Sequence, residues 1–327
     1  MLDVIGIGKP VKDLLVAVDG MPPEDGACLA RGLSSQGGGK VASALVSAAR
    51  QGMRCGMYAV LGDDSKGRFC KEDFERHGID TSHITLIPGE TSPFCLCIAE
   101  KGSQTRRFIG SIGSSPMIDP CALDFDYLKT ARLIHLENGD PASRAAAVFA
   151  REHGILTAID ADSYSPAIAK MEPWIDLFIA STFYAEKRFP GMAPEEAVQR
   201  IHENGAKVAI VTLGSKGLAG YTDEGAFALP AFTGLEIVDT TGAGDVFHGG
   251  FISAWLRGLG AVESARYASA VSYIKCTRLG GRAGIPTREM TEHFLRTGTL
   301  IHGEELDARS ASTPSFRALS AQKSPSL

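Results

Sequence analysis

The sequence lacks long apolar runs, an excess of basic residues and a targeting segment. No stretch of about 18 apolar residues occurs, so no transmembrane helix is expected. Lys and Arg number 33 against 38 Asp and Glu, and a net charge of −5 offers no basic field for nucleic acid. The first residues, MLDVIGIGKPVKD, lack the basic segment and cleavage site of a signal peptide. We therefore expect a cytoplasmic protein with no nucleic-acid and no membrane partner.

The cysteines are few and scattered, and they form no CxxC motif. Their number, seven, is odd, and most lie inside apolar runs, which predicts reduced, packed thiols. Cys95 and Cys97 share one face of a predicted strand and could together ligate a metal. No further ligand follows at metal-binding spacing, so packing is the favoured interpretation.

Apolar segments of strand length alternate with segments of helical period along most of the 327 residues. This alternation is typical of an α/β fold with a mainly parallel sheet covered by helices, here one domain over residues 1–303. The predicted strands are Val4–Ile7, Met57–Leu61, Leu133–Leu136, Leu156–Ile159, Leu177–Ala180 and Val208–Leu213. The predicted helices lie near 39–51, 66–77, 142–153, 194–204, 243–257, 262–278 and 287–296.

Two regions and the tail depart from this alternation. Residues 14–33 and 93–110 contain β-type stretches with no helix between them. We expect them to form a small antiparallel sheet at the edge of the main one, acting as a lid. Residues 304–327 are rich in Ser and Pro and show no apolar period, so the tail is expected to be disordered.

Two glycine motifs resemble nucleotide-binding patterns but are incomplete. Gly6-Ile-Gly8 is followed by Val11, where a dinucleotide-binding motif needs its third glycine. Gly39-Lys40 has Ser34 and Val41 where a P-loop needs Gly and Ser or Thr. Neither a dinucleotide-dependent dehydrogenase nor a P-loop protein is indicated.

The strongest local signal is the run VDTTGAGDVFHGGF over 238–251. Its first two glycines allow a turn whose N–H groups point into one cavity, and helical spacing begins at Val246. A glycine turn at a helix N-terminus binds anions, because orphan N–H groups and the helix dipole both favour negative charge. The small residues at 242–244 and at 249 and 250 predict open space that a packed core would fill.

Asp245, in the first turn of this helix, is the candidate general base. It would accept the proton of an attacking hydroxyl while the amides of 242–244 hold a transferring phosphoryl group. The alternative, that Asp245 only caps the helix, leaves the small residues around it unexplained.

This run resembles the C-terminal signature of the ribokinase/PfkB family of carbohydrate kinases. Residues 37–52, GGGKVASALVSAARQG, are similar to the N-terminal signature, and the resemblance covers about residues 1–300. It implies a ribokinase-like, Rossmann-type central sheet flanked by helices, with a β-sheet lid. It also implies ATP-dependent phosphorylation of a hydroxyl, a primary one, on a small sugar or ketose derivative.

The resemblance further implies a role for individual residues. Asp245 matches the family's catalytic base, and its anion hole corresponds to Gly242, Ala243 and Gly244. The residues that match its sugar-binding positions are Asp13, Gly38, Gly39, Lys40 and Ser43. Those that match its ATP-binding stretch are Thr212, Gly214 and Gly217.

A monovalent-cation site is implied at Asp239 and Thr241, with potassium also held by carbonyls of the loop Cys276–Ile285. A buried carboxylate at Asp239 would need a counter-charge, since alone it would compete with phosphate for the same amides. The alternative is direct pairing with Arg278 or Arg282 of the same loop.

Two positions differ from the family pattern. Ser43 stands where the family often has Asn, which puts that sugar contact in question. Ser181 and Tyr184 replace the Asn-x-x-Glu element that organises Mg²⁺, with Glu186 as a nearby substitute. Mg²⁺ is still expected to arrive with ATP, because it binds substrate phosphates more than dedicated protein cages.

The C-terminal part looks especially like the branch with sulfofructose kinase and ketohexokinase-like members. An anionic sugar would need cations in the pocket, yet Ala27 stands where Lys is expected, and 137–140 contains no Arg. Lys9, Arg106 and Arg107 are expected to be solvated, so a neutral sugar is favoured over sulfofructose.

Three further hypotheses follow. A nucleoside kinase would use aromatic lid residues such as Phe94 and Phe108 against the base. A catalytically silent sugar-binding regulator is disfavoured by the retained Asp245. The lid leaves a sheet edge and an apolar face that a second copy could cover, which predicts a homodimer.

Overall fold

The computed structural model describes residues 1–100 and 106–312. Its main sheet has nine strands in the order β13-β12-β11-β10-β9-β8-β1-β4-β5. Neighbouring strands are parallel from β5 to β11, and the edge hairpin of β12 and β13 is antiparallel. The strands are β1 Leu2–Ile7, β4 Cys55–Gly62, β5 Ile84–Ile87, β8 Ala131–Leu136, β9 Leu156–Ala161, β10 Leu177–Ser181, β11 Val208–Thr212, β12 Leu218–Thr222 and β13 Gly225–Leu229.

Helices cover both faces of this sheet. Successive residues of a strand point to opposite faces, and apolar side chains on both faces must be buried. Val4 packs in the core under α1, α8 and α9, while its neighbour Ile5 packs in the core under α4 and α7. All six predicted strands and all seven predicted helices are confirmed. The helices are α1 Lys40–Arg50, α2 Ser65–Arg76, α3 Phe125–Leu128, α4 Pro141–Glu152, α5 Pro166–Ala169, α6 Thr182–Arg188, α7 Pro194–Glu203, α8 Ala243–Leu256, α9 Ala261–Lys275, α10 Arg288–Thr297 and α11 Gly303–Ser312, with short 3₁₀ turns η1 Pro120–Ala122, η2 Glu172–Trp174 and η3 Gly214–Lys216.

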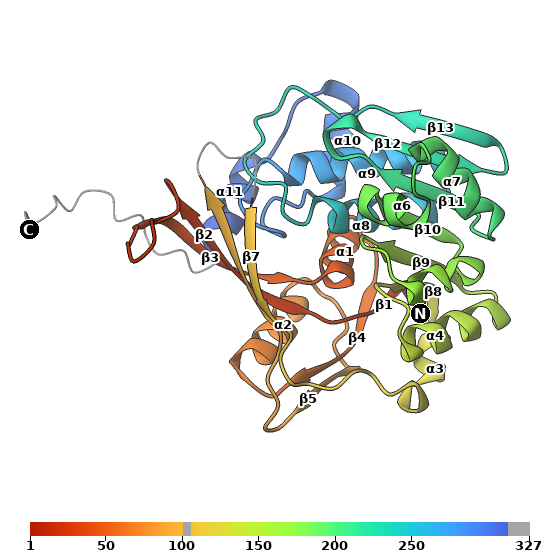
Figure 1. Ribbon diagram of the computed structural model, residues 1–327, viewed down its shortest axis with the longest axis horizontal. Coiled ribbons are helices and arrows are strands. Elements are labelled where there is room, and N and C mark those ends of the chain that lie inside the picture. Colours follow the sequence, from red (N-terminus) through yellow and green to blue (C-terminus); the bar gives the residue numbers. More distant parts are fainter. Residues whose placement is uncertain (101–105, 313–327) are drawn as a thin grey trace, which may run out of the picture.

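A second sheet of four strands, which we call the lid sheet, projects from one side of this α/β body (Figure 1). Its order is β3-β2-β6-β7, from β2 Val11–Val18, β3 Ala30–Gly38, β6 Phe94–Glu100 and β7 Arg106–Ser111. The expectation of a purely antiparallel sheet is wrong, because β2 and β6 are parallel. Each follows a strand of the parallel main sheet, β1 or β5, so both leave the body at the same edge and run outward together.

The tail is ordered further than the sequence predicts. Disorder is expected from Glu304 onward, yet α11 forms there, and Leu306 is fully buried against Ile274 and Phe294. A single buried leucine in a short polar helix gives no apolar period that could be recognised in the sequence. Residues 313–327 lie outside the described residues. Among the helices that are described, none has the length and apolar character needed to cross a membrane.

Candidate active site

The turn before α8 is the segment that the sequence predicts to form an anion hole. Gly242 caps the helix in the left-handed conformation, with φ of +70°, which glycine adopts without strain. A Cβ added at Gly244 would meet no atom within 4 Å, so this position faces open space. The N–H of Ala243, the first residue of α8, donates to the carbonyl oxygen of Thr240 at 3.1 Å. The other N–H groups of the first turn have no partner further along the helix, and together with the helix dipole they favour a negatively charged ligand at this end.

Asp245 lies in the first turn of α8, half-buried at this open position. Burial raises the pKa of its carboxyl well above the usual value, and the negative charge of Asp160 adds to the effect, while Lys40 opposes it. A carboxyl with a raised pKa is better suited to accept a proton than an ordinary aspartate. Asp245 is therefore partly desolvated, which distinguishes its environment from that of a solvated helix cap.

The glycines at 249 and 250 do not contribute to this open space, contrary to the prediction. A Cβ at Gly249 would lie 2.2 Å from the carbonyl oxygen of Ala44, and one at Gly250 would lie 3.0 Å from Cα of Ala268. Both residues allow α8 to approach neighbouring helices closely, the first α1 and the second α9. The small residues of this run thus serve two purposes. Those at 242–244 line the candidate site, and the glycines at 249 and 250 allow close packing of helices.

A cluster of charged side chains lies near Asp245, and the charges of Asp160, Lys40 and Asp162 act on its pKa. Lys40, the first residue of α1, donates from Nζ to Asp162 Oδ1 at 2.8 Å and to the carbonyl oxygen of Glu137 at 3.3 Å. Asp160 pairs with His248 at 3.4 Å, and this interaction lowers the pKa of Asp160 in spite of its burial. The arrangement keeps Asp160 charged, and its charge is one of those that raise the pKa of Asp245.

Sequence reasoning missed Glu137, Asp160 and Asp162 as members of the site. All three lie at the carboxyl ends of parallel strands, two at the end of β9 and Glu137 directly after β8. Ligands of open α/β sheets bind at this edge, so an acidic residue at a strand end is the signal that could have identified them. Burial raises the pKa of Glu137 to about 7.

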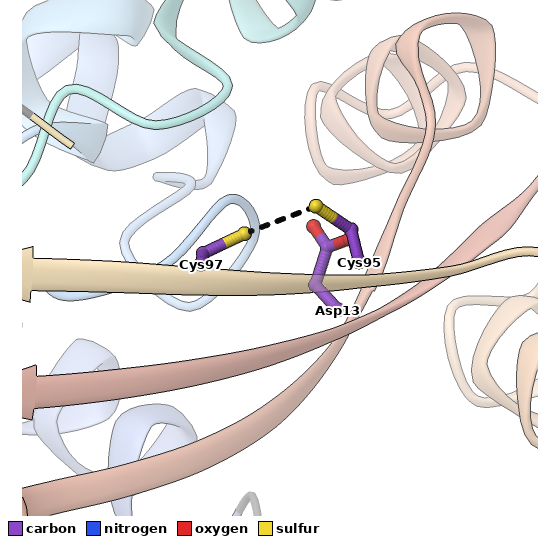
Figure 2. Close-up of side chains that lie close together, drawn as sticks. All are labelled: Asp13, Cys95 and Cys97. Atoms are coloured by element: carbon purple, nitrogen blue, oxygen red, sulfur yellow. Dashed lines mark hydrogen bonds between the residues drawn. The ribbon is translucent and has the colours of Figure 1, made fainter. Parts of the chain in front are cut away.

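On the sugar side, Asp13 of β2 points to the same face of the lid sheet as Cys95 and Cys97 of β6 (Figure 2). Asp13 lies directly opposite Cys95 in the parallel register, and the two sulfur atoms are 3.7 Å apart. The carboxyl oxygen and both sulfurs lie within 4.8 Å of one another. Burial and the nearby Asp13 carboxylate raise the pKa of both thiols, so both are neutral at pH 7 and form a weakly polar wall beside Asp13.

Asp13 is buried, and burial raises its pKa to about 6, with the charge of Arg282 opposing this rise. A Cβ at Gly38 would lie 2.2 Å from Asp13 Oδ2, so the glycine turn passes directly against the carboxyl group. Gly39, with φ of +91°, then begins α1. The structure thus places Asp13 beside the turn of Gly38 and Gly39, which leads into Lys40 at the start of α1.

Ser43 occupies a different environment from the other predicted sugar residues. It is 1% exposed, and its Oγ accepts a hydrogen bond from Arg282 Nε at 3.3 Å. Arg282 also donates to Asp73 Oδ2 at 2.5 Å and to the carbonyl oxygen of Gly38 at 2.9 Å. All three guanidinium nitrogens of this buried arginine are therefore engaged by the protein itself.

The predicted nucleotide residues follow β11. Thr212 ends this strand, Gly214 (φ +58°) begins the turn η3, and Gly217 (φ +97°) closes it. A Cβ at Gly217 would lie 2.0 Å from the carbonyl oxygen of Leu229, so this glycine is required by the edge hairpin as well. The three residues occupy one turn at the carboxyl edge of the sheet.

Ser181 and Tyr184, which stand where the family pattern has Asn-x-x-Glu, lie at the start of α6. Ser181 caps this helix and donates from Oγ to the carbonyl oxygen of Asp162 at 2.5 Å. Tyr184 is fully buried, and its hydroxyl donates to Glu172 at 2.5 Å, so it belongs to the core. Glu186 is exposed on the same helix.

Asp239 is 5% exposed, and both of its carboxylate oxygens accept hydrogen bonds. Oδ1 accepts from the backbone N–H of Thr241 at 2.9 Å and from its hydroxyl at 2.8 Å, and Oδ2 accepts from the N–H of Gly280 at 2.8 Å. The positive charge nearby is Lys275, whose Nζ donates to the carbonyl oxygens of Asp239 and Thr241.

A counter-charge for Asp239 therefore exists within the chain, and it is neither of the two arginines considered from the sequence. Lys275 lowers the pKa of Asp239 in spite of burial. Arg282 pairs with Asp73, and Arg278 pairs with Asp307 at 2.6 Å. The sequence concealed this role, because Lys275 ends a helix, where a lysine is ordinarily assigned to the surface.

The chain is similar to known kinases over most of its length. The family model "pfkB family carbohydrate kinase" matches residues 1–288. An ATP-dependent ribose-1-phosphate kinase of Halopiger xanaduensis is 27% identical over 304 residues, which cover 90% of this chain and 98% of the relative. A nucleoside kinase of Methanothermobacter thermautotrophicus is 26% identical over 300 residues, covering 89% and 95%.

Solved structures share the fold. A candidate ribokinase II from E. coli, in complex with ATP and Mg²⁺, superimposes with a TM-score of 0.80 at 23% identity, covering 90% of this chain and 99% of that one. The nine-stranded sheet flanked by helices, with the smaller four-stranded sheet, is thus a ribokinase-like fold, as the sequence predicts.

Proposed function

The chain belongs to the pfkB family of carbohydrate kinases, and we propose that it transfers the terminal phosphoryl group of ATP to a hydroxyl, a primary one, of a small neutral sugar or ketose derivative. The observation that carries this proposal is the position of Asp245, a desolvated carboxyl one residue beyond the open Gly244. A base at that place can take the proton of a hydroxyl as it attacks a phosphoryl group held by the helix N-terminus.

The residues of this chain would share the reaction as follows. Asp13 orients the sugar by accepting hydrogen bonds from its hydroxyls, and Asp245 accepts the proton of the reacting hydroxyl. The amides of Gly242, Ala243 and Gly244 stabilise the charge on the transferring group. The turn of Thr212, Gly214 and Gly217 would hold ATP.

Mg²⁺ would enter with the nucleotide and neutralise phosphate charge. The donor set fits a hard cation, since Glu137 and Asp162 supply carboxylate oxygens at the carboxyl edge of the sheet. Tyr184 is unavailable, because its side chain is buried in the core. We therefore propose that Glu137 and Asp162 would position Mg²⁺ in place of the Asn-x-x-Glu element.

The charges of the sugar side support a neutral substrate over an anionic one. Arg282, the buried cation beside Asp13, already has Asp73, Ser43 and a backbone carbonyl as partners. Lys9 donates from Nζ to the carbonyl oxygen of Ser115 at 2.9 Å. A sulfonate or phosphate group on the substrate would thus face the Asp13 carboxylate, and neither Arg282 nor Lys9 would be free to pair with it. This arrangement disfavours the binding of an anionic sugar.

The relatives alone do not decide the substrate, because kinases named for ribose-1-phosphate and for nucleosides are almost equally similar to this chain. A screen for ADP release over pentoses, ketohexoses, sugar acids, sulfosugars and nucleosides tests the proposal. We expect activity with a neutral sugar or ketose. Activity confined to nucleosides or to anionic sugars would contradict the substrate class, and ADP release with none of them would support the silent regulator.

For the assembly, we propose a homodimer through the lid sheet. Phe108, Ile109 and Ile112, on or next to β7, are 57%, 59% and 85% exposed. β7 also lies at the edge of the four-stranded sheet, where unpaired backbone groups are available to a partner. Sedimentation at micromolar concentration should show a dimer that Ile109→Lys converts to monomer, and a monomeric wild-type protein would contradict the proposal.

A further inference from the structure

The last turn of α9 holds the segment that leads into the anion hole. Ser272 Oγ donates to the carbonyl oxygen of Ala243 at 2.7 Å. The carbonyl oxygen of Cys276 accepts from the N–H groups of Val238 and Asp239 at 2.8 and 3.0 Å. Lys275 Nζ donates hydrogen bonds to the carbonyl oxygens of Asp239 and Thr241 in the same segment. Positions 272, 275 and 276 share one face of a helix, so a single rigid turn determines the course of residues 238–243.

Lys275 is 0% exposed, although lysine is almost never fully buried unless it is paired. Its ammonium group donates hydrogen bonds to backbone carbonyl oxygens, and its positive charge lowers the pKa of the nearby Asp239 carboxyl group. An isolated buried ammonium would be strongly destabilising, so this placement is maintained by the carbonyl dipoles and the carboxylate together.

The ligands of Lys275 are those that a bound monovalent cation would use. A cation at this place would take backbone carbonyl oxygens of the 239–241 segment and balance the charge of Asp239. The lysine does both with a charge that is covalently part of the chain and that carries three N–H donors. Carbonyl oxygens that accept from an ammonium group are not available to a metal ion at the same point.

We propose that the Lys275 ammonium group is a built-in substitute for a monovalent cation, so that this enzyme needs no potassium. This inference rests on the proposed kinase function and revises the potassium site expected at Asp239 and Thr241. Lys275 is a positioning residue. It fixes the carbonyl groups of Asp239 and Thr241, and through them the direction of the amides at 242–244.

The test is a titration with KCl in tetramethylammonium buffer at constant ionic strength, with activity and melting temperature measured together. In the wild-type protein we expect neither quantity to respond to potassium. In Lys275→Ala, which opens the cation position, we expect kcat to be low without potassium and to rise about 5- to 150-fold with K⁺ or NH₄⁺, the usual range for coupling between two sites. The melting temperature of this variant should rise over the same concentrations.

Two variants control this experiment. Lys207→Met removes a lysine that is 59% exposed and paired with Asp176, and it should remain insensitive to potassium. Lys275→Met keeps the apolar stem and replaces Lys275→Ala if the latter does not fold. A wild-type enzyme activated by potassium would overturn the proposal, and so would Lys275 variants whose kcat and melting temperature are both unaffected by K⁺ and NH₄⁺.

The melting temperature separates this inference from the proposed function. If no sugar supports ADP release by the wild-type protein, the kinase assignment fails, yet the potassium-dependent stabilisation of Lys275→Ala can still be measured. If the wild-type enzyme is active and potassium raises its kcat, the kinase assignment stands and the role of Lys275 fails.

Discussion

The proposed phosphate side and the proposed sugar side of the site are built in opposite ways. The phosphate side consists of one continuous segment, 239–245, held by a single helix turn from α9. The sugar side is assembled from β2, β6, the start of α1 and the loop that carries Arg282, elements far apart in the sequence. A local motif can specify the first, whereas the second depends on how the lid sheet and the body meet.

The two sides also differ in the state of their carboxylates. Asp239 has hydrogen-bond donors on both oxygens and a lysine nearby, and its pKa is lowered. Asp13 is buried with its pKa raised to about 6. The difference indicates that the protein itself satisfies Asp239, whereas in the proposed function Asp13 would accept hydrogen bonds from sugar hydroxyls. Three experiments test or sharpen this comparison.

The largest effect is expected on the phosphate side. Asp245→Asn removes the proton acceptor and leaves the amides of the anion hole in place. We expect kcat to fall by about 10²–10⁴-fold, the usual contribution of general acid–base catalysis, with ATP affinity and melting temperature little changed. Steady-state kinetics and nucleotide titration measure both quantities, and turnover close to the wild-type value would remove Asp245 from the mechanism.

The next effect concerns Asp13 and pH. Its folded-state pKa of about 6 lies above the value of about 3.9 in an unfolded chain. Protonated Asp13 therefore contributes to the free energy of unfolding, and this contribution is at most about 3 kcal/mol. It is complete below about pH 4 and is lost as the pH rises through 6.

Urea unfolding at about pH 4.5 and about pH 7 without sugar checks this expectation against Asp13→Asn, whose amide does not titrate. Other carboxyl groups contribute equally to both proteins, so the difference between their pH profiles isolates Asp13. Parallel profiles would show that Asp13 is solvated in the free protein, in which case the contrast with Asp239 fails.

The smallest effect separates the two groups of small residues on α8. Gly249→Ala places a Cβ 2.2 Å from a carbonyl oxygen of α1, and we expect a loss of about 1–3 kcal/mol in the free energy of unfolding. Gly244→Ala is the matched control, because its Cβ meets no atom within 4 Å. Equal destabilisation of the two variants would contradict the assignment of Gly249 to packing and Gly244 to the open site.

The sequence by itself predicted the parts of this protein that depend on short-range patterns. Buried parallel strands such as β10 form uninterrupted apolar runs, and helices such as α4 show a clear apolar period, so their bounds were predictable. The glycine turn before α8 was predictable for the same reason, since its residues are neighbours in the chain. The lid segments were located, but the parallel pairing of β2 and β6 was not.

Only the tertiary structure decided which charges meet. Lys275 and Asp239 are 36 residues apart and Arg282 and Asp73 are 209 apart, and no local pattern relates either pair. The same limit applies to Gly249, whose small size predicted open space but which α1 approaches closely. Secondary structure follows from short-range periodicity, whereas the pairing of buried charges follows from long-range packing, because desolvation makes each buried charge depend on whatever the fold places beside it.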